Sequence, residues 1–234
     1  MTEDRLTFLF GLVAVQTEQG LSLPARVCRA CVDTLSISGA VLALVSHDGA
    51  GGTVAATEAL SPDVHELQFT LGEGLGVDAF ATGAIVLEPD LGDPTAAARW
   101  PAFAPGAQQS GTAAAFAFPL SFGGTRVGAL CLYRDTPGPL SSRELADGTL
   151  LASIATVVMI AMQSQVARPA DDLHAAIEGG AGPAVVHQAT GMAMVQLGVT
   201  IAEAFVLVRA YAFAHDRPLA AVAADLVARR LVLD

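Results

Sequence analysis

The sequence has few charged residues and no lysine. Charged side chains make up 15% of its 234 residues, and all twelve basic residues are arginines. The 23 acidic residues give a formal net charge of −11 at pH 7. A chain of this charge has no overall attraction to nucleic acids or to anionic membranes. Any contact with a nucleic acid must therefore come from a local patch of the surface.

Cysteines and long apolar runs are also scarce. Three cysteines are too few for a disulfide framework and favour a reducing compartment, the cytoplasm. The opening stretch "MTEDRLTFLFGLVAVQTEQG" begins with acidic residues and lacks a small-residue cleavage site, so we interpret it as an amphipathic helix and not as a signal peptide. The apolar run at residues 150–162 is shorter than the ~20 residues that cross a bilayer. We therefore expect a soluble, cytoplasmic protein with no membrane partner.

Hydrophobic residues, 53% of the chain, are numerous enough for a sizeable core. Two helices are expected at residues 4–19 and 23–35. The stretch "AVLALVSHDGAGGTVAATEA" then predicts two strands joined by a glycine-rich turn. In "TAAAFAFPLSFGGTRVGALCLYR", two longer strands flank a turn at Gly123-Gly124. Both strands are apolar on both faces, which predicts a hairpin in the middle of the sheet, covered on each side.

A long apolar helix follows the hairpin. Ser141 and Glu144 form a capping box ahead of "LLASIATVVMIAMQSQ", where apolar residues occupy nearly every direction around the axis. A helix at the edge of a small domain needs only one buried stripe, so the second apolar face predicts a partner helix from another copy of the chain. Arg168-Pro169 ends the pattern, because the residue before proline avoids helical conformations. We place a domain boundary there, between units 1–167 and 168–234.

The second unit carries the pattern of three short helices. Gly198 is suited to end the first helix, and Thr200 with Glu203 forms a capping box for the second. The third begins near Arg217-Pro218. The apolar side chains that we expect to be buried are Val185, Ala189, Met192 and Val195 on the first helix, Ile201, Phe205, Val208 and Ala212 on the second, and Leu219, Val222, Ala223, Leu226 and Val227 on the third. Each stripe is narrow, so the three helices must pack on one another.

No catalytic or metal-binding motif is recognisable. The "GEGLG" segment at residues 72–76 lacks the lysine and the spacing of a phosphate-binding loop, and we interpret it as a bend leading into a helix. Cys28 and Cys31 would lie on one helix face, either as a redox or metal pair or as small buried hydrophobes. We expect no enzyme, and no cofactor is identifiable. The histidines are scattered without metal-ligand spacing: His47, His65, His174, His187 and His215.

Both units resemble known families. Positions 1 to about 166, with "LGEGLGVDAFATGAIVLEPDLGD", "FPLSFGGTRVGALCLYR" and "GPLSSRELADGTLLASIA", resemble a GAF domain. The stretch "HQATGMAMVQLGVTIAEAFVLVRAYAFAHDRPLAAVA" resembles an ANTAR domain, the three-helix RNA-binding module of transcription antitermination regulators. The resemblance implies an α+β fold: a GAF-like antiparallel sheet flanked by helices, with a small-molecule pocket on one face, followed by an all-α three-helix domain.

The resemblance also implies where ligands bind. The expected RNA-binding face, which would meet RNA hairpin loops, carries Gln188, Thr190, Gly191, Arg209, Tyr211 and Arg217, with His215 as a further stacking candidate. The apolar residues around the expected pocket of the GAF-like unit are Phe80, Trp100, Phe103 and Phe116. With few polar groups nearby, either this pocket takes an apolar or aromatic small molecule, or it is collapsed and the unit only dimerises.

Some of these residues leave two interpretations open. Gly191 lies in the middle of a helix, where a ligand approaches the backbone or a neighbouring helix packs closely. Arg209 either reaches an RNA phosphate or is an ordinary surface charge. Tyr211 is either a stacking platform or part of the core.

Two functions follow from these patterns. The first is a cytoplasmic, homodimeric regulator that binds RNA in transcription antitermination, with a GAF-like unit that senses a ligand or fixes the dimer. The alternative is a dimerising protein-interaction module whose ANTAR-like end has lost RNA binding. The alternative is favoured by Thr190, which stands where the family commonly has lysine, and by the excess of acidic over basic residues after position 170.

Overall fold

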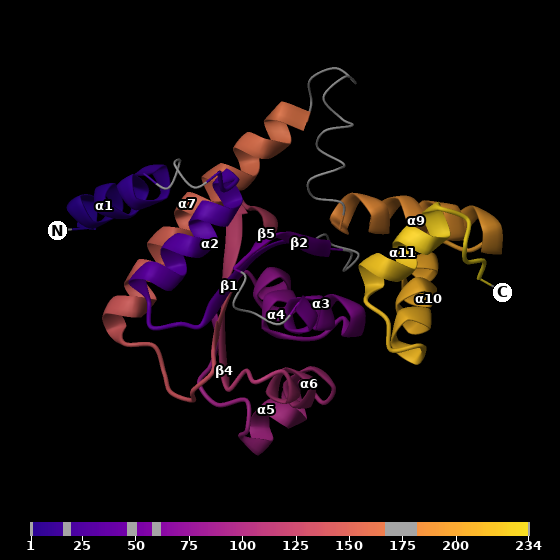
Figure 1. Ribbon diagram of the computed structural model, residues 1–234, viewed down its shortest axis with the longest axis horizontal. Helices are drawn as coiled ribbons and strands as arrows, with labels where there is room; N and C mark the ends of the chain where they lie inside the picture. Colours follow the sequence, from indigo (N-terminus) through magenta and orange to yellow (C-terminus); the bar gives the residue numbers. More distant parts are fainter. Residues whose placement is uncertain (1, 16–19, 46–50, 58–61, 167–181, 234) are drawn as a thin grey trace.

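A five-stranded antiparallel sheet forms the centre of the first unit (Figure 1). The computed structural model describes residues 2–15, 20–45, 51–57, 62–166 and 182–233. The strands lie in the order β2-β1-β5-β4-β3, and all neighbours are antiparallel. They are β1 (Gly39–Val45), β2 (Gly51–Ala56), β3 (Val86–Glu88), β4 (Ala114–Phe122) and β5 (Thr125–Arg134). The predicted hairpin is β4-β5, and it lies inside the sheet as expected.

Helices α1 (Thr2–Val15), α2 (Leu23–Thr34) and α7 (Ser142–Val166) belong to one side of the sheet (Figure 1). Phe116 and Phe118 point to this side and share a buried cluster with residues of all three helices. The capping box at the start of α7 is confirmed: the Ser141 hydroxyl accepts a hydrogen bond from the Glu144 amide, and the Glu144 carboxylate accepts one from the Ser141 amide. The pKa of Glu144 is lowered to about 2, mainly by these hydrogen bonds with Ser141.

The opposite side of the sheet carries four short helices (Figure 1). They are α3 (Pro62–Leu71), α4 (Leu75–Thr82), α5 (Pro94–Arg99) and α6 (Phe103–Gln109). The glycine-rich segment 72–76 turns the chain from α3 into α4, as predicted. Gly74 is the N-cap of α4 with a φ of 130°, a conformation that favours glycine.

The second unit is a bundle of α9 (Gly182–Leu197), α10 (Ile201–Ala214) and α11 (Leu219–Val227). Gly198 ends α9 with a φ of 66°, and the capping box of Thr200 and Glu203 begins α10. A bend of 106° separates α9 from α10. Three helices are therefore confirmed. As predicted, α9 ends at Gly198 and α10 begins after Thr200.

The predicted buried stripe of α9 is only partly right. Ala189 is buried as expected, and Val185 and Met192 are half-buried. Val195 is 76% exposed, and the other buried apolar side chains are Val186 and Ala193. Apolar residues surround α9, so the sequence permits either stripe, and the small alanines allow the closer approach of the neighbouring helices. On α10, Ile201 is likewise exposed, whereas the other predicted residues of that helix are buried.

The two units are packed together. Helix α9 lies against β2, and α10 and α11 lie against α3, on the right of Figure 1. Buried apolar residues of the second unit, such as Phe205, belong to the same core cluster as Phe69 of α3. This cluster lies on the side of the sheet that carries α3 to α6. The boundary predicted at Arg168-Pro169 lies outside the described residues.

Helix α7 is more apolar over a longer stretch than the sequence run had indicated. By length and hydropathy, Ser142–Met162 is sufficient to cross a membrane, and the pair α9-α10 meets the same test only as one bent segment. Half of this apolar stretch of α7 is buried inside the protein. Core helices of globular domains have this combination of length and burial.

A partly buried ion pair joins the first helix to the last helix of this unit. Arg5 on α1 donates two hydrogen bonds to the carboxylate of Asp147 on α7, at 2.8 and 2.7 Å. The Asp147 side chain is only 5% exposed. The pair therefore fixes α1 to α7 and satisfies a carboxylate that burial would otherwise penalise.

Arg5→Ala should destabilise the protein. Among the described residues, the Asp147 carboxylate would keep only the ion pair with Arg143, 3.9 Å away, so we expect the free energy of unfolding at pH 7 to fall by about 1–3 kcal/mol. Arg29→Ala is the control, because it breaks the exposed pair of Arg29 with Asp33 and should cost about 0.5 kcal/mol or less. Urea unfolding measures both changes, and equal losses would contradict a special role for the buried pair.

The same pair predicts a dependence on pH. The hydrogen bonds from Arg5 lower the pKa of Asp147 in the folded state. The stabilisation is therefore complete above the unfolded pKa of about 3.9 and is lost as the pH falls through the folded pKa. The difference in stability between the wild type and Arg5→Ala should shrink below about pH 4.

Candidate functional site

Three of the four predicted pocket residues lie together on the side of the sheet that carries α3 to α6. Phe80, Trp100 and Phe103 are each 5% exposed or less. The rings of Trp100 and Phe103 meet edge to face, with centroids 6.4 Å apart. These side chains fill their own side of the sheet and leave none of their rings open to a ligand. The arrangement agrees with the collapsed form of the expected pocket.

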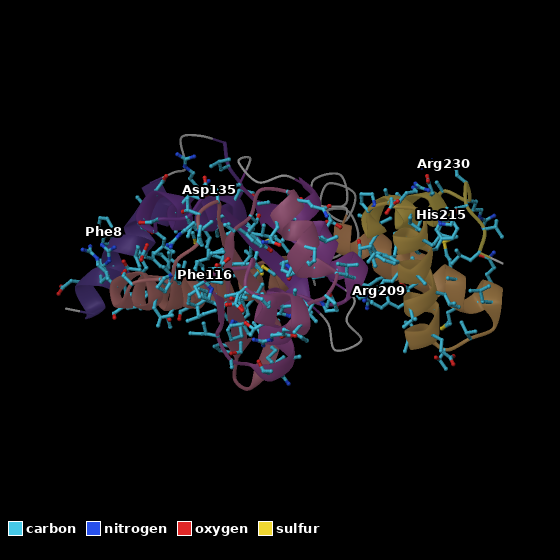
Figure 2. All side chains as sticks on the ribbon, turned by 90° about the horizontal axis from the view of Figure 1, so that it is seen from below. Phe8, Phe116, Asp135, Arg209, His215 and Arg230 are labelled. Carbon is cyan, nitrogen blue, oxygen red and sulfur yellow. The ribbon has the colours of Figure 1, made fainter. Side chains whose placement is uncertain are left out.

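Phe116, the fourth predicted residue, lies on the opposite face. Side chains alternate along β4, so Ala115 and Ala117 point toward α4, whereas Phe116 points toward α2 and α7. The prediction that Phe116 lines the same pocket as Trp100 is therefore corrected. Figure 2 labels Phe116 within the side chains between the sheet and these helices.

A buried polar network around Gln68 lies on the same side of the sheet as Trp100 and Phe103. The Gln68 amide on α3 donates to the Tyr133 hydroxyl at 3.2 Å and to the Cys131 sulfur at 3.7 Å. The backbone amide of Gly76 donates to the side-chain carbonyl oxygen of Gln68 at 3.0 Å. Burial raises the pKa of Tyr133 well above its ordinary value, so the phenol stays neutral. Gln68 thus fixes α3 to the start of α4 and to β5.

Two carboxylates that the sequence did not single out hold the segment with Trp100. Glu73 accepts hydrogen bonds from the backbone amides of Ala102 and Phe103, both at 2.7 Å. Asp78 accepts one from the Trp100 indole at 3.2 Å and pairs with Arg99 at 2.8 Å. The sequence does show these acidic residues around the glycine-rich turn. The groups that they bind lie more than twenty positions away, so the pairing could not be predicted.

In the second unit, Gln188 and Gly191 line an open groove of about 560 Å³ between α9, α11 and the chain end. A Cβ atom at Gly191 would meet nothing within 4 Å, so close packing of a neighbouring helix does not account for this glycine. The groove offers the amides of Gln188 and Gln196 and the guanidinium of Arg229 around an apolar floor. The other lining residues are Met192, Val195, Leu226, Leu231 and Val232.

Thr190 does not belong to that groove. Its side chain is buried, and its hydroxyl donates to the Val186 carbonyl at 2.8 Å within α9. The hydroxyl is satisfied inside the helix, so the structure does not bring Thr190 to an exposed RNA-binding face. Gln188 and Gly191, which lie two and one positions from it, do reach the surface.

Arg209 faces the first unit and not solvent alone. Its Nε donates to the Thr70 carbonyl at the end of α3, at 3.3 Å, and its guanidinium lies 5.4 Å from the centroid of the Phe205 ring. A Cβ atom built on Gly72 would overlap the guanidinium. Burial lowers the pKa of Arg209. Figure 2 shows Arg209 where the second unit meets the first.

The remaining predicted residues have partners of their own. Tyr211 stacks on His215, with ring centroids 3.9 Å apart, and packs partly against the core. Arg217 pairs with Asp225, which also pairs with Arg230 at 2.7 Å. Of the six predicted residues, the structure brings Gln188 and Gly191 together and places Arg209 at the unit interface.

The three cysteines are free and buried in the described part of the chain. Cys28 and Cys31 are buried among apolar side chains, and Cys131 lies in the other core cluster. Burial raises the pKa of Cys28 to about 12 and that of Cys131 to about 11. No group of three or more potential metal ligands occurs among the described residues. The interpretation of the Cys28-x-x-Cys31 pair as buried hydrophobes is the one that this geometry favours.

An antiparallel sheet with helices on both sides, followed by a three-helix bundle, defines a two-domain α+β architecture. A model of the GAF domain matches residues 23–163, and a model of the ANTAR domain matches residues 173–227. The chain therefore belongs to the GAF domain family and carries an ANTAR domain after its GAF domain. It is a GAF-containing regulator with an ANTAR RNA-binding output domain, and both domains are regulatory.

Three solved structures are similar to the first domain, and the first of them, with a TM-score above 0.5, supports the shared fold. The GAF domain of a phosphoenolpyruvate-protein phosphotransferase from Acinetobacter is 14% identical with a TM-score of 0.51, over 71% of this chain and 97% of that chain. A type II free methionine-R-sulfoxide reductase from Thermoplasma acidophilum is 18% identical with a TM-score of 0.45, over 63% and 94%. A phycocyanobilin-bound GAF domain of a cyanobacterial phytochrome is 12% identical with a TM-score of 0.47, over 72% and 98%. No curated protein matches the chain.

The buried thiols should be unreactive in the folded protein. All three cysteines are inaccessible and have raised pKa values, so we expect a thiol-disulfide reagent at pH 8 to label none of them within minutes. In denaturant, all three should react. Absorbance of the released thiolate measures the number labelled. Rapid labelling of one cysteine without denaturant would instead support a redox role.

Proposed function

We propose that this protein is a cytoplasmic, homodimeric regulator whose ANTAR domain binds hairpin loops in nascent RNA and thereby acts in transcription antitermination. The observation that carries the proposal is the groove of the ANTAR domain, in which the open backbone of Gly191 lies beside two amides and a guanidinium. Unpaired bases need this combination: an apolar surface for the ring and hydrogen-bonding groups for its edge. Gln188 carries a donor and an acceptor, whereas Gln196 already donates to the Leu233 carbonyl at 3.0 Å and keeps its carbonyl oxygen and a second amide hydrogen for a base.

The charge of the domain indicates how the RNA is held. Arg217 and Arg230 are paired with Asp225, so few guanidinium groups are left to neutralise phosphates. Recognition then depends on base edges and stacking more than on the backbone. We expect the affinity for RNA to fall only gently with salt concentration, in contrast to a basic RNA-binding protein.

Val195→Glu tests the groove. Val195 is 76% exposed on the groove wall, so the substitution leaves the core intact and brings a carboxylate to the proposed base site. We expect binding to a single RNA hairpin to weaken at least about tenfold, through repulsion and lost apolar contact. Val206→Glu on α10 is the matched control, because Val206 is also an exposed valine of the ANTAR domain, at 58%, and does not line the groove. Fluorescence anisotropy with hairpins of varied loop sequence measures both variants.

Equal binding by the two variants would remove the groove from the RNA site. Equal binding to a duplex without a loop would contradict recognition of unpaired bases.

Dimerisation is proposed through the flanking helices of the GAF domain. Phe8 and Phe10 on α1 and Val157 on α7 are all more than half exposed. Figure 2 shows Phe8 at the end of the molecule away from the ANTAR domain. Beside Val157, an apolar depression of about 360 Å³ runs between α7 and β4. This much apolar surface on adjacent helices is typical of a contact between copies of a chain.

Val157→Glu should therefore yield a monomer. A carboxylate within this apolar surface would be desolvated in the dimer, and we expect sedimentation at micromolar concentrations to give half the wild-type mass. Val195→Glu, which changes the ANTAR domain only, should remain dimeric. A wild type that sediments as a monomer, or a Val157→Glu dimer, would contradict this interface.

The role proposed for the GAF domain is to fix the dimer and to control the ANTAR domain. Its core is filled by Trp100, Phe103 and the Gln68 network, so an effector must displace these side chains to enter. Such an effector would be a small apolar or aromatic molecule, in keeping with the lining.

One observation favours the alternative, a protein-interaction module. The floor of the ANTAR groove is mostly apolar, and Val232 on its rim is 61% exposed. A partner helix with an apolar stripe would also fit this lining. The hairpin measurement distinguishes the two functions, because the interaction module binds no RNA even at low salt.

A further inference from the structure

Thr70, the penultimate residue of α3, contacts two helices of the ANTAR domain. Its carbonyl accepts the hydrogen bond from Nε of Arg209 on α10. Its hydroxyl accepts one from the backbone amide of Leu219, the first residue of α11, at 3.3 Å. One residue of the GAF domain thus binds both helices. Without this contact, the Arg209 guanidinium and the Leu219 amide would hydrogen-bond to water.

The end of α3 is well suited to bind a guanidinium. The last carbonyls of a helix carry partial negative charge, which favours a cation at this place. Gly72 follows with a φ of 69°, and its amide donates to the Gln68 carbonyl at 2.8 Å. Because Gly72 has no side chain, the guanidinium of Arg209 lies directly over its backbone, where a Cβ atom would overlap it. The glycine serves the turn and the contact at once.

Apolar side chains surround this polar contact. Leu67 and Leu71 on α3 pack partly against the cluster that contains Phe205 and Val208 of α10. A crevice of about 230 Å³ beside the contact is lined from both domains. The docked arrangement therefore combines a charged contact with a buried apolar one, and it involves the arginine that the family resemblance assigns to RNA.

We propose that the GAF domain holds the ANTAR domain in a docked state in which the end of α3 withholds Arg209 from RNA. This inference rests on the proposed RNA-binding function and adds its regulation. In the docked state the groove around Gly191 stays open, so RNA binds through part of its site. Undocking frees Arg209 and completes the site. The apparent association constant of the whole chain is then the average of the constants of the two states, weighted by their populations. Where the docked state binds much more weakly, it approaches the constant of the undocked state reduced by the undocked fraction.

Gly72→Ala tests the inference. The added methyl group expels the guanidinium, and we expect hairpin RNA to bind about tenfold more tightly than to the wild type, for a docked state that prevails by that factor. Gly83→Ala is the matched control: Gly83 also ends a helix, with a φ of 70° and the same type of backbone hydrogen bond. A Cβ atom there meets only Arg126 at 3.7 Å, an ordinary contact. The strain is equal in the two variants, and only one of them disturbs Arg209.

A second pair of variants avoids the strained glycine. Thr70→Arg brings a like charge against Arg209, and it should tighten RNA binding as Gly72→Ala does. Thr70→Ser keeps the hydroxyl and should bind RNA as the wild type does. Hydrogen exchange of the Leu219 amide reports docking without RNA, and it should be faster in Thr70→Arg than in Thr70→Ser. Arg209→Ala also undocks the domain, but it should lose affinity, because it removes the RNA contact itself.

The outcomes separate this inference from the proposed function. Tighter binding by Gly72→Ala and Thr70→Arg, with Gly83→Ala and Thr70→Ser unchanged, supports the docked state. If all these variants and the wild type bind RNA equally while exchange at Leu219 becomes faster, the inference is overturned and RNA binding stands. If no variant binds RNA even when undocked, the proposed function fails, and the inference fails with it.

Discussion

The two faces of the β4-β5 hairpin differ in side-chain size, and the placement of the helices depends on this difference. Toward α2 and α7 the hairpin presents Phe116 and Phe118, paired across the strands with Leu132 and Leu130. Toward α3 and α4 it presents mainly small residues, such as Ala117 opposite Cys131, with Tyr133 as the one large side chain among the described residues of the hairpin on this face. Two long helices close the first face. The small residues on the second face leave room for the large side chains that α4 to α6 bring inward.

That room is filled mainly by the protein itself. Trp100 and Phe103 supply the volume, and Asp78 and Glu73 hold their segment through hydrogen bonds to the indole and to the backbone. A buried amide is costly unless it is satisfied, and Gln68 is satisfied by three partners. An effector that displaced it would have to replace those hydrogen bonds. The core thus selects its ligands by polarity as well as by size.

Much of the fold follows from local patterns, whereas the candidate site depends on contacts that no local pattern encodes. The hairpin and the capping boxes at Ser141 and Thr200 involve residues within a few positions, so they could be predicted. Which stripe of α9 is buried could not, because its apolar residues permit two. Phe116 shows the same limit for a strand: alternation separates the two faces but does not say which helices cover each. Arg209 was expected on the RNA face, yet its partner Thr70 lies 139 positions earlier.

Helix α3 carries Gln68 in the core and Thr70 at the ANTAR contact, two residues and about 3 Å apart along the helix axis. No hinge separates them, so a displacement of one moves the other. Linkage then imposes symmetry on the chain: a molecule that enters the core and loosens the ANTAR domain must itself bind more tightly, by the same factor, when RNA is bound. RNA would then act as an effector of the GAF domain as well as being its target. While a transcript stays bound, the small molecule in the GAF core would dissociate more slowly from that copy of the protein.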